Sequence, residues 1–376
     1  MQPEINEISC PKCASSQIKK HGTKKKKLQT LQRYFCNNCR KTFTLQPEKS
    51  KTYPLNIILN ALSYYNLGHS QQEAANMLSK RFKLKPSQKT ISNWINEHKE
   101  ICTFHKLRAK AIKLFKPSEM IHKQTLNHIQ PYTFKYHKAK LYLLFHSRLY
   151  NNEFHNIANF HEPLKKYLEK ISSKEFPHHI FTYQKGITSS PIAEIDKLSE
   201  NINIDSKNKN INEQRASQLK FSHLKINHIQ KQNQANQLAK LAINLAATNK
   251  QVHQSIQNFM LINDSTTIAT EIPIYLTNWD AGYYRNQNGF IFPLNNYKTP
   301  ITGHIDILQI RNGLLHILDY KPEAKNQNPI EQLTIYALAL SRKLNLPLYY
   351  FKCAWFDESN YFEFFPLHAV YERKNK

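Results

Sequence analysis

Two Cys-x-x-Cys pairs, Cys10 with Cys13 and Cys36 with Cys39, constrain the start of this chain more than any other feature. So short a segment cannot bury a sufficient core of its own, and four thiolates at this spacing suit one tetrahedral Zn²⁺. We therefore predict a zinc ribbon over residues 1–48. Its zinc would be structural, because four protein ligands leave no open position for catalysis.

The basic charge is concentrated in the front part of the chain. Residues 1–260 contain 42 Lys and Arg against 16 Asp and Glu, whereas residues 261–376 contain 11 of each. A basic surface binds phosphate backbones without regard to base sequence, so we expect DNA as the partner. With no long apolar run and no signal peptide, we expect a cytoplasmic protein that does not bind membranes. The oligomeric state cannot be deduced from the sequence.

Residues 53–100 have the pattern of three short amphipathic helices. The first follows Pro54, the second begins at Ser70 with Glu73 in a capping box, and the third begins near Ser87. Three such helices with a basic connector predict a helix-turn-helix DNA-binding domain.

The first hundred residues resemble the zinc ribbon and helix-turn-helix that open many insertion-sequence transposases. The matching segments are Cys10-Pro11-Lys12-Cys13, Ile18-Lys19-Lys20-His21-Gly22, Gln32-Arg33-Tyr34-Phe35-Cys36-Asn37-Asn38-Cys39 and Thr42-Phe43-Thr44. The resemblance implies DNA binding and an association with a mobile element, and it implies no chemistry.

Candidate DNA-binding residues lie on the third helix and in the ribbon. They are Gln88, Lys89, Ser92, Asn93 and Asn96, together with Lys24, Lys25, Lys26 and Lys27. Asn and Gln can bind adenine edges, and Lys can bind guanine or phosphate. A solvated polar helix face is an equally good interpretation of each helix residue taken singly.

The middle of the chain carries no recognised motif. We treat residues 101–182 as a mixed region of unknown role and residues 183–231, which are rich in Asn, Lys, Gln and Ser, as a linker. Apolar spacing then predicts one helix over about 233–259. We expect a catalytic domain over residues 232–376.

A β-hairpin is predicted around Asn312-Gly313, which separates two strand-like segments. If these are the two central turn residues, paired positions sum to 625, so that Asp306 faces Asp319 and His304 faces Lys321. Two carboxylates directly opposite each other repel unless a cation or a shared proton lies between them. The pattern therefore predicts a Mg²⁺ or Mn²⁺ site, with Lys321 beside it.

These residues resemble the active site of the PD-(D/E)XK nuclease superfamily, in which an Asp on one strand precedes (Asp/Glu)-x-Lys on the next. Asp306 and Asp319-Tyr320-Lys321 match this pattern. Gln332-Leu333-Thr334-Ile335-Tyr336 matches the Gln-x-x-x-Tyr motif of the RecB-like branch, and Glu271-Ile272-Pro273 resembles its Glu-x-Pro strand.

The resemblance covers residues 235–367 and implies five catalytic residues: Asp306, Asp319, Lys321, Gln332 and Tyr336. Asp306, Asp319 and Glu271 would hold the metal. No proline precedes Asp306, which departs from the pattern without removing a catalytic group. Only Cys353 is available near this core, so we expect no iron-sulfur cluster.

The expected fold is thus multi-domain: a zinc ribbon, a helical helix-turn-helix domain, and an α/β PD-(D/E)XK nuclease core with a central mixed sheet flanked by helices. The expected activity is Mg²⁺- or Mn²⁺-dependent hydrolysis of DNA. Two alternatives remain open: a transposase-like protein that joins DNA strands, and a DNA-binding regulator with an inactive core. RNA is also possible as the substrate, because phosphodiester chemistry does not select the sugar.

Overall fold

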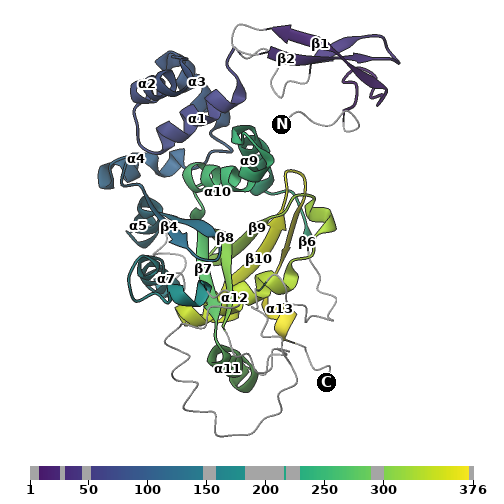
Figure 1. Ribbon diagram of the computed structural model, residues 1–376. Helices are drawn as coiled ribbons and strands as arrows, with labels where there is room; N and C mark the ends of the chain where they lie inside the picture. The colour runs from purple at the N-terminus through teal and green to yellow at the C-terminus, as the bar shows by residue number, and fades with distance from the viewer. Residues whose placement is uncertain are drawn as a thin grey trace. The chain divides into compact units, whose positions relative to one another are not determined.

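The computed structural model describes residues 8–25, 30–44, 52–146, 158–182, 216, 229–288 and 300–371 (Figure 1). The chain forms two compact units. The first unit combines Met1–Ile112 with Gln237–Asp264, and the second combines Lys113–Asn236 with Ser265–Lys376. Each unit is therefore built from two separate stretches of sequence. This division differs from the consecutive domains expected from the sequence.

The ribbon is a small antiparallel sheet of β1 (Ile18–Lys25), β2 (Thr30–Cys36) and β3 (Thr42–Thr44), in that order. Among its described residues, the buried cluster consists of Ile8, Cys10, Ile18, Tyr34 and Cys36. So small a cluster contributes little hydrophobic stabilisation, which agrees with the expectation that a metal takes the place of a core.

Three helices pack on one another in the first unit. They are α1 (Leu55–Asn66), α2 (Gln71–Phe82) and α3 (Gln88–His98), and α4 (His105–Leu114) follows them. The predicted capping box is confirmed: the Ser70 hydroxyl accepts the Glu73 N–H, and the Glu73 carboxylate accepts the Ser70 N–H. The Ser87 hydroxyl caps α3 by accepting the Thr90 N–H.

The chain returns to this helical unit after more than a hundred residues. The returning elements are α9 (Gln234–Ala242), the 3₁₀ turns η4 (Ile243–Leu245) and η5 (Asn249–Gln251), and α10 (Val252–Asn263). Buried amides join α10 to α1: Asn66 Nδ2 donates to Asn263 Oδ1 at 2.8 Å, and Asn263 Nδ2 donates to Ser63 Oγ at 3.0 Å.

The single helix expected over 233–259 is wrong, because the chain is extended at Ala246 and Thr248. Thr248 and Asn249 favour caps and turns over helix interiors, since their side chains compete for backbone hydrogen bonds. Apolar spacing alone did not reveal this break.

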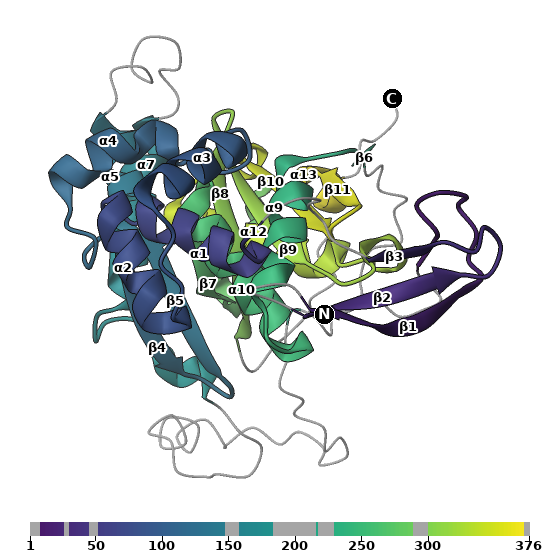
Figure 2. The same ribbon diagram turned by 90° about the horizontal axis from the view of Figure 1, so that it is seen from above.

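The second unit is built on a mixed eight-stranded sheet with the order β4-β5-β7-β8-β9-β10-β11-β6 (Figure 2). Its strands are β4 (Ile121–Asn127), β5 (Pro131–His137), β6 (Ile229–Gln230), β7 (Thr267–Leu276), β8 (Ile301–Arg311), β9 (Leu314–Tyr320), β10 (Phe351–Phe356) and β11 (Tyr361–Phe364). Only β9 and β10 are parallel; the other neighbours are antiparallel.

Helix α12 (Ile330–Leu344) joins the two parallel strands and packs against β7, β8, β9 and β10. The further helices and turns of this unit are α5 (Lys138–His146), α7 (Ala158–Ile171), η2 (His178–Phe181), α11 (Asn278–Asn288), η6 (Ala324–Asn326), η7 (Leu348–Tyr350) and α13 (Leu367–Val370). Leu338 on α12, Ile317 on β9 and Phe134 on β5 are all fully buried in one core.

The region of unknown role therefore contributes β4 and β5 to the same sheet as the candidate catalytic strands. Their signal was the alternation of Tyr132, Phe134 and Tyr136 on β5, which the sequence analysis did not use. In the part of the chain that the structure describes, every helix is too short or too polar to cross a lipid bilayer.

Candidate functional site

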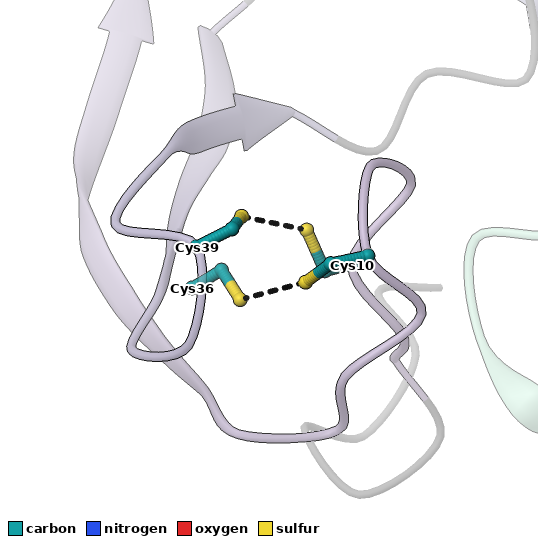
Figure 3. A group of neighbouring side chains, drawn as sticks. Cys10, Cys36 and Cys39 are labelled. Carbon is teal, nitrogen blue, oxygen red and sulfur yellow. Dashed lines mark hydrogen bonds between the residues drawn. The ribbon is translucent and has the colours of Figure 1, made fainter.

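The four N-terminal cysteines form one cluster. The Sγ atoms of Cys10 and Cys39 are 3.6 Å apart, as are those of Cys13 and Cys36, and all four lie within 4.8 Å of one another (Figure 3). Zn–S bonds of about 2.3 Å place the sulfurs of a tetrahedron about 3.8 Å apart. The cluster therefore has the dimensions of a four-cysteine metal site and can hold a metal ion such as structural zinc.

The two cysteine turns share one backbone geometry. Cys10 N–H donates to Ser15 O, and Cys36 N–H donates in the same way to Lys41 O. The residue after each pair, Ala14 or Arg40, has a left-handed φ of 55°.

Backbone N–H groups donate hydrogen bonds to the cysteine sulfurs within these turns. Burial raises the pKa of Cys10, but hydrogen bonds from the backbone of Lys12 and Cys13 outweigh it and lower the pKa to about 6. Donors to the sulfur favour the thiolate, which is the form that binds metals.

The predicted hairpin register is confirmed from Ile307↔Leu318 to Arg311↔Leu314. Asn312 and Gly313 have φ values of 52° and 73°, as a type I′ turn requires. Continuing the same register by one residue places Asp306 opposite Asp319.

A third acid lies in the same row. The β7–β8 register runs through Thr270↔Ile307 and Ile272↔Ile305, so Glu271 is opposite Asp306. Carboxylate oxygens of Glu271 and Asp306 lie within 4.8 Å of each other. Three acids thus follow one line across β7, β8 and β9, with Asp306 in the middle.

Glu271 has an unusual backbone conformation for this position. Its φ is 53°, a left-handed value inside a strand, where a residue with a Cβ is strained. Such strain costs about 1 to 3 kcal/mol and is often found at functional sites.

Asp319 is buried, with 2% of its surface exposed. Burial raises its pKa well above the usual range, and the Asp306 carboxylate raises it further, while Lys321 opposes both effects. Lys321 Nζ lies 2.9 Å from Asp319 Oδ2. The structure therefore contains both the predicted pair of carboxylates, Asp306 and Asp319, and the ammonium group of Lys321 beside them.

Gln332 and Tyr336 meet on α12, where Gln332 Nε2 donates to the Tyr336 hydroxyl at 3.0 Å. Burial raises the pKa of Tyr336, and the charges of Asp306 and Asp319 raise it further. The ring fits against β8 because residue 303 is glycine: a Cβ there would lie 2.4 Å from Tyr336 Cε1.

His304 contacts a histidine from the turn between β4 and β5. Its Nε2 lies 2.8 Å from His128 Nδ1, and His128 Nε2 lies 3.1 Å from His178 Nδ1. The Tyr132 ring stacks on His304 with 3.6 Å between centroids. These contacts join the β4–β5 hairpin and η2 to β8, two residues before Asp306.

Lys135 on β5 is a charged neighbour that the sequence analysis missed. Burial and the charge of Lys123 lower its pKa to about 8, against the opposing effect of Glu271. No spacing rule could have found it, because only the β5–β7 pairing brings it near Glu271.

Four of the five candidate DNA-binding residues on α3 are exposed: Gln88, Lys89, Asn93 and Asn96. Ser92 is partly exposed, and Gln88 donates to Gln72 of α2 at 2.9 Å. Lys24 and Lys25 are exposed at the end of β1, whereas Lys26 and Lys27 lie outside the described residues.

No protein-family model matches the chain, and neither a curated protein nor a solved structure matches it. Any assignment of function therefore rests on the residues and their geometry.

Proposed function

We propose that this protein is a metal-dependent DNA nuclease with its catalytic centre in the second unit. The observation that carries the proposal is the row of Glu271, Asp306 and Asp319 on three neighbouring strands, with Lys321 at 2.9 Å from Asp319. Carboxylates in such contact are costly without a cation because like charges repel, and the Asp306 carboxylate accordingly raises the pKa of Asp319. The PD-(D/E)XK resemblance ascribes the same residues to phosphodiester hydrolysis.

Asp306, Asp319 and Glu271 would hold Mg²⁺ or Mn²⁺, since both ions prefer carboxylate oxygens. Such an ion supplies a Lewis acid that polarises the phosphate and lowers the pKa of water. In the hydrolysis, a water oxygen bonds to phosphorus and the bond from phosphorus to one sugar oxygen breaks. One proton of the water ends on that sugar oxygen, and its hydroxyl group stays on the phosphate.

The chain's own groups orient and stabilise the reacting phosphate. The Lys321 ammonium group is placed to stabilise negative charge that develops on the phosphate oxygens. Tyr336, held by Gln332 and kept protonated by burial and the nearby acids, offers a hydroxyl donor at the same place. Both residues would bind and orient the phosphate.

The first unit would hold the DNA. Its cysteine cluster fits structural zinc, and α3 carries an exposed polar face, as the transposase-type ribbon and helix-turn-helix resemblance implies. Lys89, Asn93 and Asn96 would contact bases or phosphates from α3.

The test incubates the full chain with linear, circular and single-stranded DNA, and with RNA, in Mg²⁺, Mn²⁺ or chelator. We expect DNA cleavage that requires the metal and falls by at least about 100-fold in Asp319→Asn and Lys321→Met. The matched control is Asp280→Asn, which alters a buried, ion-paired aspartate of the same unit outside the acid row.

Full cleavage by both site variants would refute the catalytic assignment. Joined DNA strands in place of simple cleavage products would favour a transposase-like activity. Tight binding to one sequence without metal-dependent cleavage would favour a regulator.

A further inference from the structure

The sheet of the ribbon has two faces of different character. Its buried strand residues belong to one face: Ile18, Tyr34 and Cys36. The alternating positions belong to the other face, where Lys19 is opposite Phe35 and Phe35 is opposite Thr42. These three residues form one row across β1, β2 and β3, with Phe35 on the central strand. We call the face that carries this row the outer face of the ribbon.

Two further side chains of the outer face lie close to this row. Lys19 Nζ lies 5.2 Å from the centroid of the Phe35 ring, and the His21 ring centroid lies 5.7 Å from the same point. Arg33 is two residues before Phe35 on β2, so it shares this face, and its Nε donates to His21 O at 3.3 Å. Lys19 and His21 are exposed, and Arg33 and Phe35 are partly exposed. The outer face therefore combines two rings with two cations.

Packing of the ribbon core does not explain Phe35. The phenylalanine that packs against the buried cluster is Phe43, whose ring stacks on Tyr34 with 5.8 Å between centroids. Phe35 alternates with the buried residues of β2 and stays partly exposed. Its contact with Lys19 stabilises an exposed sheet only modestly. The ring is therefore more useful to a ligand than to the fold.

The charge of the ribbon indicates which kind of ligand this is. Residues 8–44 contain ten Lys and Arg and no Asp or Glu. Four thiolates around one Zn²⁺ offset only a small part of this charge. Because this segment supplies no carboxylate to Lys19 or Arg33, the outer face attracts phosphate groups.

The rings distinguish a single strand from a duplex. In a duplex the bases stack on one another and present only their edges in the grooves. An unpaired base exposes its flat face and can stack on an aromatic side chain, while neighbouring cations bind the phosphates. A single strand can thus use both features of the outer face, whereas a duplex can use only the cations.

We propose that the outer face of the ribbon binds single-stranded nucleic acid, with bases stacked on Phe35 and His21 and phosphates at Lys19 and Arg33. The same chemistry suits DNA and RNA, because every base has an aromatic face. This site differs from the polar face of α3, to which duplex contacts are ascribed above. It goes beyond the proposed nuclease, because binding here requires neither the acid row nor its metal.

The first measurement is binding of the full chain, purified with Zn²⁺, in buffer without Mg²⁺ or Mn²⁺. The probes are a single strand of about 12 nucleotides, as DNA and as RNA, and a DNA duplex of the same sequence. Phe35→Leu should weaken single-strand binding by at least about 5-fold and leave duplex binding nearly unchanged. Phe35→Tyr should retain single-strand binding, because a tyrosine ring also stacks on bases.

Two variants on the opposite face are the matched controls. Phe43→Leu makes the same change on the face of the buried cluster, and Lys20→Ala removes the exposed lysine next to Lys19, opposite the buried Tyr34. Lys19→Ala should weaken single-strand binding, whereas Lys20→Ala should change it little. The zinc content of each variant reports whether its ribbon is intact.

The second measurement uses the unaltered chain, so it does not depend on the folding of any variant. A single strand that carries one iodouracil is bound to the full chain and irradiated, and the cross-linked peptide is identified by mass spectrometry. Excited iodouracil bonds to an aromatic side chain that stacks on it, with loss of hydrogen iodide. We expect the attachment at Phe35 or His21.

Attachment only outside residues 18–36 would overturn the site. Equal losses of single-strand binding in Phe35→Leu and Phe43→Leu would also overturn it, as would equal losses of single-strand and duplex binding in Phe35→Leu. Tighter binding of the RNA strand than of the DNA strand would retain the site and assign it to RNA. Cleavage of DNA in Mg²⁺ without a cross-link to the ribbon would retain the nuclease and reject this site, so the two failures are distinguishable.

Discussion

Gly303→Ala tests the packing of Tyr336 against β8. A Cβ at position 303 would lie 2.4 Å from Tyr336 Cε1 and 3.0 Å from its hydroxyl, whereas ordinary contacts begin at 3.4 Å. The ring would have to move by about 1 Å, but it is buried, with 6% exposed, and held by Gln332. Overpacking of this kind costs about 1 to 3 kcal/mol.

Gly282→Ala is the matched control. Gly282 lies in α11, and a Cβ there meets no atom within 4 Å. Because alanine favours a helix over glycine by about 1 kcal/mol, this variant should be neutral or stabilising.

The assay is native-state hydrogen exchange of β8 and α12 amides, which reports the opening free energy of this region. We expect Gly303→Ala to reduce that energy by about 1 to 3 kcal/mol, and to do so much less in a Tyr336→Ala background. Equal reductions in both backgrounds, or no difference from Gly282→Ala, would refute the close contact.

Three further predictions concern strain, pH and zinc. Glu271→Gly should be more stable than Glu271→Ala by about 1 kcal/mol in urea unfolding of the second unit, because glycine accepts the left-handed φ. Both variants should lose cleavage in the nuclease assay, and equal stability of the two would contradict the strain at this position. Burial lowers the pKa of His128 to about 4, so its protonation favours the unfolded state. The second unit should therefore lose stability as the pH falls from 6.5 towards 4. Urea titrations over this range should show a smaller loss of stability in His128→Gln. Elemental analysis should find one zinc ion in the ribbon of the unaltered chain and none after Cys36→Ser, and retained zinc would contradict the four-cysteine site.

Local sequence rules predicted the features that depend on neighbouring residues. The Asn312-Gly313 turn requires two left-handed residues, so its position alone fixed the β8–β9 register. The same holds for the Ser70 capping box, whose partners are three residues apart. The cysteine cluster was predictable because Cys-x-x-Cys pairs combine at one metal regardless of the loop between them.

Contacts between distant segments were not predictable in this way. No local pattern indicates that Asn263 bonds to Asn66, or that β5 pairs with β7. Periodicity identifies a strand or a helix, but it does not identify the partner. Lys135 was therefore missed, although its residue type and strand could both be read from the sequence.

Glu271 links the backbone of the sheet to the chemistry proposed for it. Its left-handed φ is strained, its contact with the Asp306 carboxylate is unfavourable in the absence of a cation, and Asp306 in turn meets the buried Asp319. In a fold selected for stability alone, a glycine would remove the backbone strain and a neutral side chain would remove the repulsion between carboxylates. A bound cation relieves only the repulsion. Local rules are thus broken at adjoining positions on β7, β8 and β9, which is the distribution expected of a binding site and not of scattered imperfections.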